Sequence, residues 1–343
     1  DNIKYIIWGT GDPEWGDPRD VGKRMFSNHV IWLCRNKPMS ASEIAEELNV
    51  PTLYVEEELE ILRKGANGKY GFLRKLDNGK YDVSVGDVHM TVDAAHGGKI
   101  LSFRLVDNEI LSQTRFPNSF GSTFWTSPQS EWNWPPVPEY DSKAFAAEIK
   151  DNSLILTGEK SNRFGYRIRK QFTPDPSDNS IAITYTIVNE SGETRKVAPW
   201  EITRVTNSGI VFFEADEVTP ANNMETLPFT FEKRAAWYVL DGDRSHRKIN
   251  ADGTGWLAFS DYGLLFVKKF QDLDKTQPAP AEAEIQIYAN PGKSFVEIEE
   301  QGAYTTLNPG EEVDWTVRWY LIPQPRPDVP SKSLLNKALK LIK

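Results

Sequence analysis

The spacing of apolar residues changes near residue 82 and divides the chain into two regions. Between residues 21 and 64 the apolar positions form three clusters at helical spacing, which predicts three helices. The segment from Ser40 to Glu43 has the pattern of a capping box, which marks the start of the second helix. Residues 69–81 then form two short runs around Asp77-Asn78-Gly79, a pattern that predicts a hairpin.

From residue 83 onward the apolar period is two, which is typical of strands. At least ten strands, separated by turns rich in Asn, Asp and Gly, predict a large antiparallel β-sandwich. Residues 116–141 and 271–283 break the alternation and are expected to be long loops, which are usually functional. The fold class is therefore mainly β, preceded by a small α+β domain.

These patterns predict three parts of the chain. Residues 1–82 form the helical domain with an N-terminal extension, and residues 83–323 form the sandwich. Residues 324–343 form a Pro-rich linker followed by a short basic amphipathic helix, which we expect to pack on the edge of the sandwich.

Charge and cysteine content exclude several classes of protein. The 343 residues carry 40 Lys and Arg against 49 Asp and Glu, a net charge of −9, which opposes binding to phosphate backbones and anionic membranes. One cysteine, Cys34, excludes a disulfide framework and a Cys-based zinc site. No His, Asp or Glu cluster has the spacing of a metal site, and no cofactor is expected.

The sequence also bears on localisation. No apolar run approaches the roughly 20 residues that a membrane span needs. The chain starts at Asp1 without an apolar signal region, so we expect a cytoplasmic protein. A periplasmic location is the alternative if a signal peptide preceded Asp1.

Residues 18–82 resemble the winged helix-turn-helix family, which implies DNA binding with the third helix in the major groove. The third helix is acidic, however, and opposes contact with phosphates. Basic residues are concentrated in the hairpin, so we expect only weak DNA binding through it, and we favour a protein partner or self-association of the helical module. The acidic residues of the helix are Glu56, Glu57, Glu58 and Glu60, and the basic residues of the hairpin are Lys69, Arg74, Lys75 and Lys80.

The strongest signal for a binding site lies between residues 120 and 136. Trp125, Trp132 and Trp134 alternate there with polar residues, Gln129 among them, on a segment stiffened by three prolines. Sugars require this combination, because their C–H faces are apolar and their rims carry hydroxyls. The alternative is that these indoles fill the end of the sandwich core.

Two further segments place polar residues on strands. Strand alternation puts Glu297 and Glu299 on one face of the segment 295–299. In the segment 197–204 it puts Trp200 and Arg204 on one face and Glu201 on the other, so only one of these faces can line a site.

In this order, these segments resemble the galactose-mutarotase-like superfamily, and more closely a bacterial mutarotase-related family of unknown function. The resemblance spans residues 83–323 and implies a β-supersandwich whose concave face binds a carbohydrate. The segments that carry the resemblance are 96–103, 125–136, 199–201, 297–301 and 307–311.

Aldose epimerases of this superfamily open the sugar ring with a glutamate base and a histidine acid. Glu299 matches the position of the glutamate, but the histidine positions read Ser122-Thr123-Phe124 and Trp200-Glu201. We therefore expect weak or absent mutarotation.

Two function hypotheses follow, and a third interpretation treats the two halves as independent. In the first, the protein binds a carbohydrate and acts as a sugar-responsive regulator through its helical module, with Arg204 and Lys269 contacting anionic groups. In the second, it is a sugar epimerase or another carbohydrate-modifying enzyme that uses Glu201 and Glu299 as a catalytic carboxylate pair. A geometry in which these two carboxyls face each other across a cleft would favour the enzyme. The ligand-binding candidates are Trp125, Gln129, Trp132, Trp134, Trp200, Arg204, Lys269 and Glu297.

Overall fold

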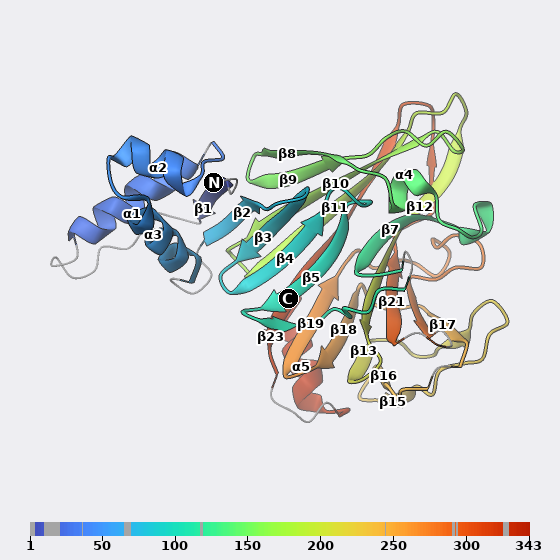
Figure 1. Cartoon of the computed structure of the whole chain (residues 1–343). Coiled ribbons are helices and arrows are strands. Elements are labelled where there is room, and N and C mark those ends of the chain that lie inside the picture. Colours follow the sequence, from blue (N-terminus) through green and yellow to red (C-terminus); the bar gives the residue numbers. More distant parts are fainter. Residues whose placement is uncertain are drawn as a thin grey trace.

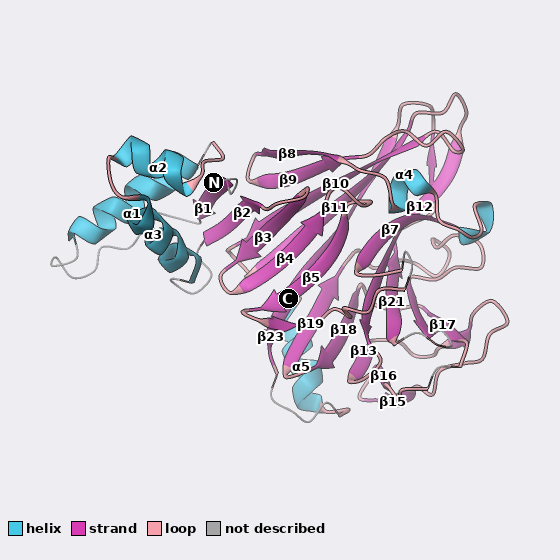
Figure 2. Cartoon of the chain, viewed as in Figure 1, coloured by secondary structure: helices cyan, strands magenta, loops and turns pink. Residues whose placement is uncertain are grey.

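The computed structural model consists of a small helical region at one end of two large antiparallel sheets (Figure 1). It describes residues 4–9, 21–35, 37–64, 70–116, 119–243, 245–289, 292, 294–324 and 329–343. Figure 2 shows the helical region at this end, whereas strands joined by loops, with a few short helices, form the rest.

Three helices form where the apolar clusters predict them: α1 (Val21–Cys34), α2 (Ala41–Leu48) and α3 (Thr52–Lys64). The predicted capping box is confirmed, because the Ser40 hydroxyl accepts from the Glu43 amide and the Glu43 carboxylate accepts from the Ser40 amide. Their buried side chains, among them Val30, Ile44 and Leu59, form a separate core.

The predicted hairpin forms from β2 (Tyr70–Lys75) and β3 (Lys80–Val85), but it is not a free wing. β2 also pairs with β1 (Lys4–Gly9), and β3 pairs with β4 (Val88–Asp93), so both strands continue the larger sheet. Tyr70 and Phe72 pack into the helical core, whereas Leu73 packs into the core of the sandwich. The winged helix-turn-helix interpretation of residues 18–82 is therefore not confirmed, and the proposed boundary after residue 82 lies inside β3.

The first sheet contains 13 strands in the order β1-β2-β3-β4-β5-β7-β12-β21-β20-β17-β14, with β6 paired to β5 and β22 to β12. Its further strands are β5 (Lys99–Leu105), β6 (Asn108–Glu109), β7 (Ser122–Ser127), β12 (Arg195–Thr206), β14 (Thr219–Pro220), β17 (Arg247–Ala251), β20 (Ile285–Ala289), β21 (Phe295–Gln301) and β22 (Thr305–Leu307).

The second sheet contains 10 strands in the order β15-β16-β13-β18-β19-β23-β11-β10-β9-β8. They are β8 (Ala146–Lys150), β9 (Ser153–Thr157), β10 (Tyr166–Asp175), β11 (Ser180–Asn189), β13 (Ile210–Phe213), β15 (Thr230–Glu232), β16 (Ala235–Val239), β18 (Trp256–Asp261), β19 (Leu264–Lys269) and β23 (Glu312–Pro323). Apolar side chains from both sheets form one continuous core, which confirms the predicted mainly β antiparallel sandwich.

The segment 116–141 is not the single loop that the sequence analysis expects. It contains the central strand β7, a 3-10 turn (Gln129–Glu131) and the short helix α4 (Pro138–Asp141). All six residues of β7 are buried, so the strand shows no alternation of polar and apolar positions. The segment 271–283 has no helix or strand, as expected.

The C-terminal helix α5 (Lys332–Leu341) forms as predicted, but it lies on a face of the second sheet and not on an edge. Leu334, Leu335 and Ala338 share a buried cluster with residues of β13, β16, β18 and β19. Residues 325–328 of the predicted Pro-rich linker lie outside the described residues.

Candidate functional site

The candidate site is a cleft of about 210 Å³ on the face of the first sheet that points away from the sandwich core. Five of the sequence-predicted residues line the cleft together with five that were not predicted. The lining residues are Ser119, Gln129, Trp134, Trp200, Asn222, Met224, Lys248, Tyr288, Glu297 and Glu299.

Strand register brings the predicted side chains to one face. β12 pairs with β21 so that Arg204 is opposite Glu297 and Ile202 is opposite Glu299. Opposed residues of antiparallel strands share a face, and every second residue along each strand does so too. The predicted alternation of side chains is confirmed for the segments 295–299 and 197–204. The face that carries Trp200, Glu297 and Glu299 lines the cleft.

Glu299 lies at the floor of the cleft and is almost completely buried. Its Oε2 accepts hydrogen bonds from Trp200 Nε1 at 3.0 Å and from Lys248 Nζ at 3.1 Å. Burial raises the pKa of Glu299 to about 7, although the neighbouring Lys248 ammonium lowers it. The carboxyl group can therefore change its protonation state near neutral pH.

Arg204 does not reach a ligand as the sequence analysis expects. Its side chain is fully buried, and its Nε donates to Glu297 Oε1 at 2.9 Å. The guanidinium also lies 5.8 Å from the centre of the Trp125 ring. The positive charge of Arg204 is thus neutralised by Glu297, and its role here is to position that carboxylate.

The three tryptophans of the segment 125–136 occupy different environments. Trp134 is 60% exposed and lines the cleft, so its indole is available for stacking. Trp125 is buried edge-on against Trp200, and its Nε1 donates to Asp141 Oδ1. Trp132 is only 3% exposed and donates to the carbonyl of Thr126 at 2.8 Å. Trp125 and Trp132 are therefore core side chains beneath the cleft and not exposed stacking faces.

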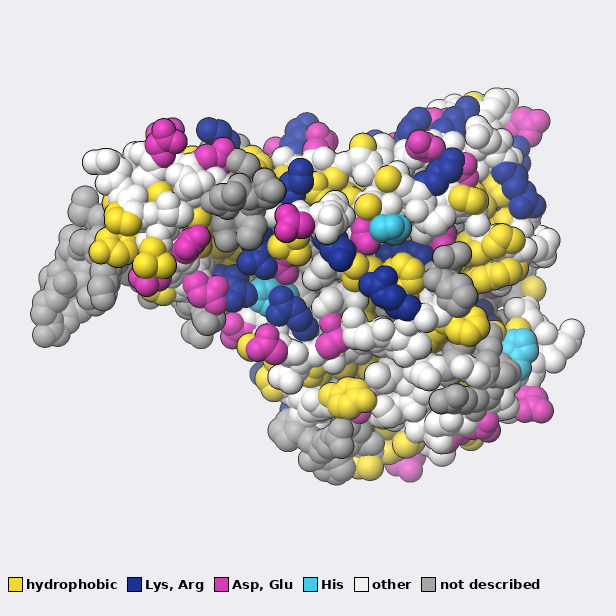
Figure 3. Space-filling model, viewed as in Figure 1, with side chains coloured by type: hydrophobic (Ala, Val, Ile, Leu, Met, Phe, Trp, Pro, Cys, Tyr) yellow, Lys and Arg dark blue, Asp and Glu magenta, His cyan; other side chains and the backbone are white. Residues whose placement is uncertain are grey.

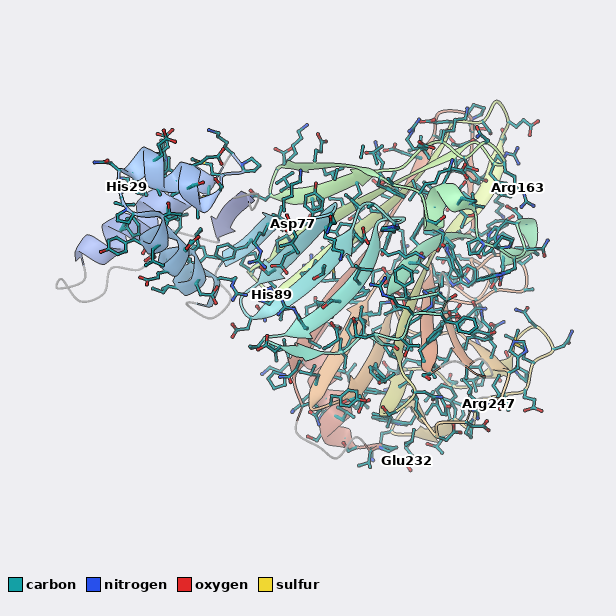
Figure 4. The ribbon with its side chains drawn as sticks, in the orientation of Figure 1. His29, Asp77, His89, Arg163, Glu232 and Arg247 are labelled. Carbon is teal, nitrogen blue, oxygen red and sulfur yellow. The ribbon has the colours of Figure 1, made fainter. Side chains whose placement is uncertain are left out.

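Arg163 supports this segment from outside. Its guanidinium, labelled at the upper right of Figure 4, donates to the carbonyl oxygens of Trp132 and Glu131 at 3.2 and 3.1 Å. Gln129 is anchored as well, because its backbone N–H donates to Glu282 Oε1. These contacts hold the loop over the cleft.

Glu201 points away from the cleft, into the space between the two sheets. Its carboxylate contacts Tyr185, Lys268 and Trp319, which all come from the second sheet. Glu201 and Glu299 therefore lie on opposite faces of the first sheet. The predicted carboxylate pair is not formed, and the proposed catalytic role of Glu201 is wrong.

Lys269 also lies far from the cleft residues. It is exposed on β19 and its Nζ donates to the carbonyl of Ile342 at 2.6 Å, beside α5. It is Lys268, the preceding residue, whose side chain enters the sandwich. The expectation that Lys269 contacts an anionic group of the ligand is therefore wrong.

Lys248 lines the cleft but is not among the residues that the sequence predicts for the site. The structure places Arg247 and Lys248 on β17 with their side chains on opposite faces. Lys248 lines the cleft, whereas Arg247, labelled at the lower right of Figure 4, pairs with Asp241. Tyr288 was missed as well, and its hydroxyl is 3.1 Å from His246 Nε2. The available signal was the alternation of the polar Lys248 and Asn250 with the apolar Ile249 and Ala251.

Within the ranges that the structure describes, no three His, Cys, Asp or Glu side chains are grouped so that they could hold a metal ion. In the same part of the chain, no helix has the length and hydropathy that crossing a membrane requires.

No protein-family model matches the chain, and no curated protein matches its sequence. Among solved structures, an Escherichia coli K12 protein assigned as an aldose 1-epimerase matches with a TM-score of 0.51 and 15% identity, covering 69% of this chain and 97% of that one. A TPR-domain-containing protein from Parabacteroides distasonis ATCC 8503 matches with a TM-score of 0.52 and 11% identity, covering 78% of this chain and 51% of that one. The comparisons do not support the winged helix-turn-helix resemblance. At these identities the likeness shows the fold alone, and that fold is the galactose mutarotase-like β-sandwich.

Proposed function

We propose that the protein binds an uncharged carbohydrate in the cleft. The observation that carries this proposal is the presence of an exposed indole, Trp134, beside two carboxylates, Glu297 and Glu299, in one cleft. Aromatic faces stack on the C–H surfaces of sugars, and carboxylate oxygens accept hydrogen bonds from hydroxyls.

Each carboxylate keeps one oxygen for a ligand. Within the described residues, the hydrogen bonds to Glu299 use Oε2, and that from Arg204 to Glu297 uses Oε1. Gln129, Tyr288 and other polar side chains of the lining add further donors and acceptors. This arrangement suits a ligand with several hydroxyl groups.

The charges of the cleft favour an uncharged sugar over a sugar acid or a sugar phosphate. Lys248 and Arg204 are both close to the cleft, but each is already paired with a carboxylate. An anionic ligand would have to break these buried ion pairs, which is costly because it leaves charges uncompensated.

The test is a calorimetric titration of the full chain with D-glucose, D-galactose, D-mannose and D-glucose 6-phosphate. We expect binding of at least one neutral sugar and weaker binding of the phosphate. Trp134→Ala should reduce the affinity by about 2 kcal/mol, on the order of thirtyfold. Trp32→Ala, which removes a 70% exposed indole from α1, is the matched control and should have no effect.

Absence of binding to every neutral sugar would refute the proposal. Equal losses in the Trp134 and Trp32 variants would refute the role of the cleft. Unchanged affinity in Trp134→Ala would show that the exposed indole is not the stacking face.

The role of a sugar-responsive regulator remains a prediction. The surface over the helical region combines acidic and hydrophobic side chains (Figure 3), and Leu53, Tyr54 and Ile61 of α3 are exposed. In the hairpin, Arg74 is 3.6 Å from Asp82, while Lys69 lies outside the described residues. These features favour a protein partner over DNA, and titration of a labelled duplex at 50 and 200 mM salt would test the weak DNA binding expected of so few phosphate contacts.

A further inference from the structure

Helix α3 presents large apolar side chains to solvent on the side that faces away from the helical core. Its inner face packs into that core, where Val55 and Leu59 are buried. On its outer face Leu53, Tyr54 and Ile61 are 58, 57 and 60% exposed. α3 thus carries three of the eleven large hydrophobic side chains that are exposed among the described residues. The fold does not require them there, because polar residues suffice on the outer face of a surface helix.

The exposed side chains form a ridge along α3. Leu53, Glu57 and Ile61 follow one another at four-residue spacing, and Tyr54 lies one position after Leu53, so all four share the outer side of the helix. From Leu53 to Ile61 the ridge extends about 12 Å, at 1.5 Å per residue. Ridges with this spacing pack into the grooves of a second helix. The geometry therefore favours a helical partner over an extended peptide, which would pair with the edge of a sheet.

Acidic side chains lie on α3 and on the helix before it. Glu56 and Glu57 are exposed on α3, and Glu46 and Glu47 are exposed on the last turn of α2. Within the part of the chain that the structure describes, none of these four carboxylates forms an ion pair. Figure 3 shows hydrophobic and acidic side chains side by side on the helical region. This charge complements a helix whose apolar face is bordered by Lys or Arg.

We propose that the ridge formed by Leu53, Tyr54, Glu57 and Ile61, which we call the α3 ridge, binds a basic amphipathic helix of a partner protein. The apolar side chains of the partner helix cover the ridge, and its Lys or Arg side chains pair with the exposed carboxylates of α2 and α3. The contact is short, so the binding is weak and reversible. Salt weakens it further, because exposed ion pairs are screened. The cleft takes no part, so this inference is independent of the proposed function.

The experiment is fluorescence anisotropy of a labelled synthetic helix titrated with the full chain. The peptide carries leucines at positions i, i+3, i+4 and i+7 and lysines elsewhere, so that its leucines share one face. One control peptide has the same composition in an order that scatters the leucines, and a second has glutamate in place of lysine. We expect only the first peptide to bind, and its affinity should fall about tenfold or more when the salt concentration rises from 50 to 500 mM.

One pair of variants tests the apolar part of the α3 ridge. Leu53→Ala/Ile61→Ala removes most of its apolar area and should weaken binding on the order of thirtyfold. Phe231→Ala/Val239→Ala is the matched control, because it removes two exposed apolar side chains of the second sheet, and it should have no effect. All four side chains are exposed, so both variants should fold, which circular dichroism would check.

A second pair of variants tests the charge. Glu56→Lys/Glu57→Lys should abolish binding of the lysine peptide and create binding of the glutamate peptide. Glu217→Lys/Glu225→Lys reverses two exposed carboxylates beside β14, at the far end of the first sheet, and should change neither. Both variants alter the net charge equally, so a difference between them reports where the peptide binds.

Three results would overturn the proposal. They are no binding of the lysine peptide, equal binding of the lysine and glutamate peptides, and equal losses in the α3 variants and their controls. A second copy of this chain is the alternative occupant of the α3 ridge. Dimerisation in analytical ultracentrifugation that Leu53→Ala/Ile61→Ala abolishes would show that a second copy covers the ridge, and this too would overturn the proposal.

Discussion

Replacing Lys268 by methionine tests the buried polar cluster between the two sheets. The Lys268 side chain is fully buried and contacts the carboxyl groups of Glu201 and Glu300, and its Nζ donates to Thr203 Oγ1 at 2.8 Å. Glu201 also accepts hydrogen bonds from residues of the second sheet. One ammonium therefore compensates two buried carboxyl groups.

The two carboxyl groups differ in protonation. Burial, together with the nearby charge of Glu201, raises the pKa of Glu300 well above its usual range. Burial also acts to raise the pKa of Glu201, but Lys268 and several hydrogen bonds lower it overall. The cluster thus holds one ammonium, one carboxylate and one carboxylic acid, and it is neutral as a whole.

Lys268→Met leaves a buried carboxylate without its cation. Removing one partner of a buried ion pair costs about 3–5 kcal/mol, which reduces the folding equilibrium constant more than a hundredfold. In the variant the pKa of Glu201 in the folded state rises above that in the unfolded state. The folded variant is then favoured at low pH, so its deficit relative to the original chain should be larger at pH 7 than at pH 4.5.

Urea unfolding followed by circular dichroism measures this difference. Lys269→Met is the matched control, since Lys269 is the next residue of β19 but is exposed, and its loss should stay within about 0.5 kcal/mol. The triple variant Lys268→Met/Glu201→Gln/Glu300→Gln should recover much of the loss, because it removes the ammonium together with both carboxyl groups. A loss below about 1 kcal/mol in Lys268→Met, equal at both pH values, would refute this reasoning.

Three further predictions concern stability. Trp132→Ala should destabilise the fold by about 3–5 kcal/mol in urea unfolding, because the indole is buried; a variant of normal stability that has lost sugar binding would contradict its assignment to the core. Burial lowers the pKa of Lys170 to about 7, so the unfolded chain binds more protons between pH 7 and 10 and this lysine makes stability increase with pH in that window. Urea unfolding at pH 7 and pH 9 should show a smaller increase of stability with pH in Lys170→Met than in the original chain. An equal increase in both proteins would contradict the assigned role of Lys170. Ser40→Ala removes the cap of α2 and should cost about 1 kcal/mol in urea unfolding, whereas an unchanged midpoint would mean that the cap contributes nothing.

Local patterns predicted the helices and many of the strands because their periods depend only on neighbouring residues. The alternation around Glu297 and Glu299 is correct for this reason. The same rule could not identify β7, because a strand that is buried on both faces has no alternation to detect.

The candidate site was predicted less completely because burial depends on contacts between distant residues. Alternation separates Trp200 from Glu201, but it does not say which face meets the second sheet. The sequence likewise does not distinguish the exposed Trp134 from the buried Trp132, since both have polar and apolar neighbours. Lys248 and Glu299 lie on β17 and β21, and β20 separates these two strands in the sheet. Their proximity therefore depends on the order of the strands, which the pattern along the chain does not give.

The sharing of β2 and β3 between two cores affects how the chain can be divided. A fragment that begins at residue 83 would lack β2 and half of β3, so β4 would lose much of its hydrogen-bonded neighbour and become a sheet edge. Unpaired edges of this kind promote aggregation between molecules. A fragment that ends at residue 82 would expose Leu73, which is 1% accessible in the intact chain. Amide hydrogen exchange of β2 and β3 should therefore slow to the rate set by global unfolding, because their opening disrupts both cores at once.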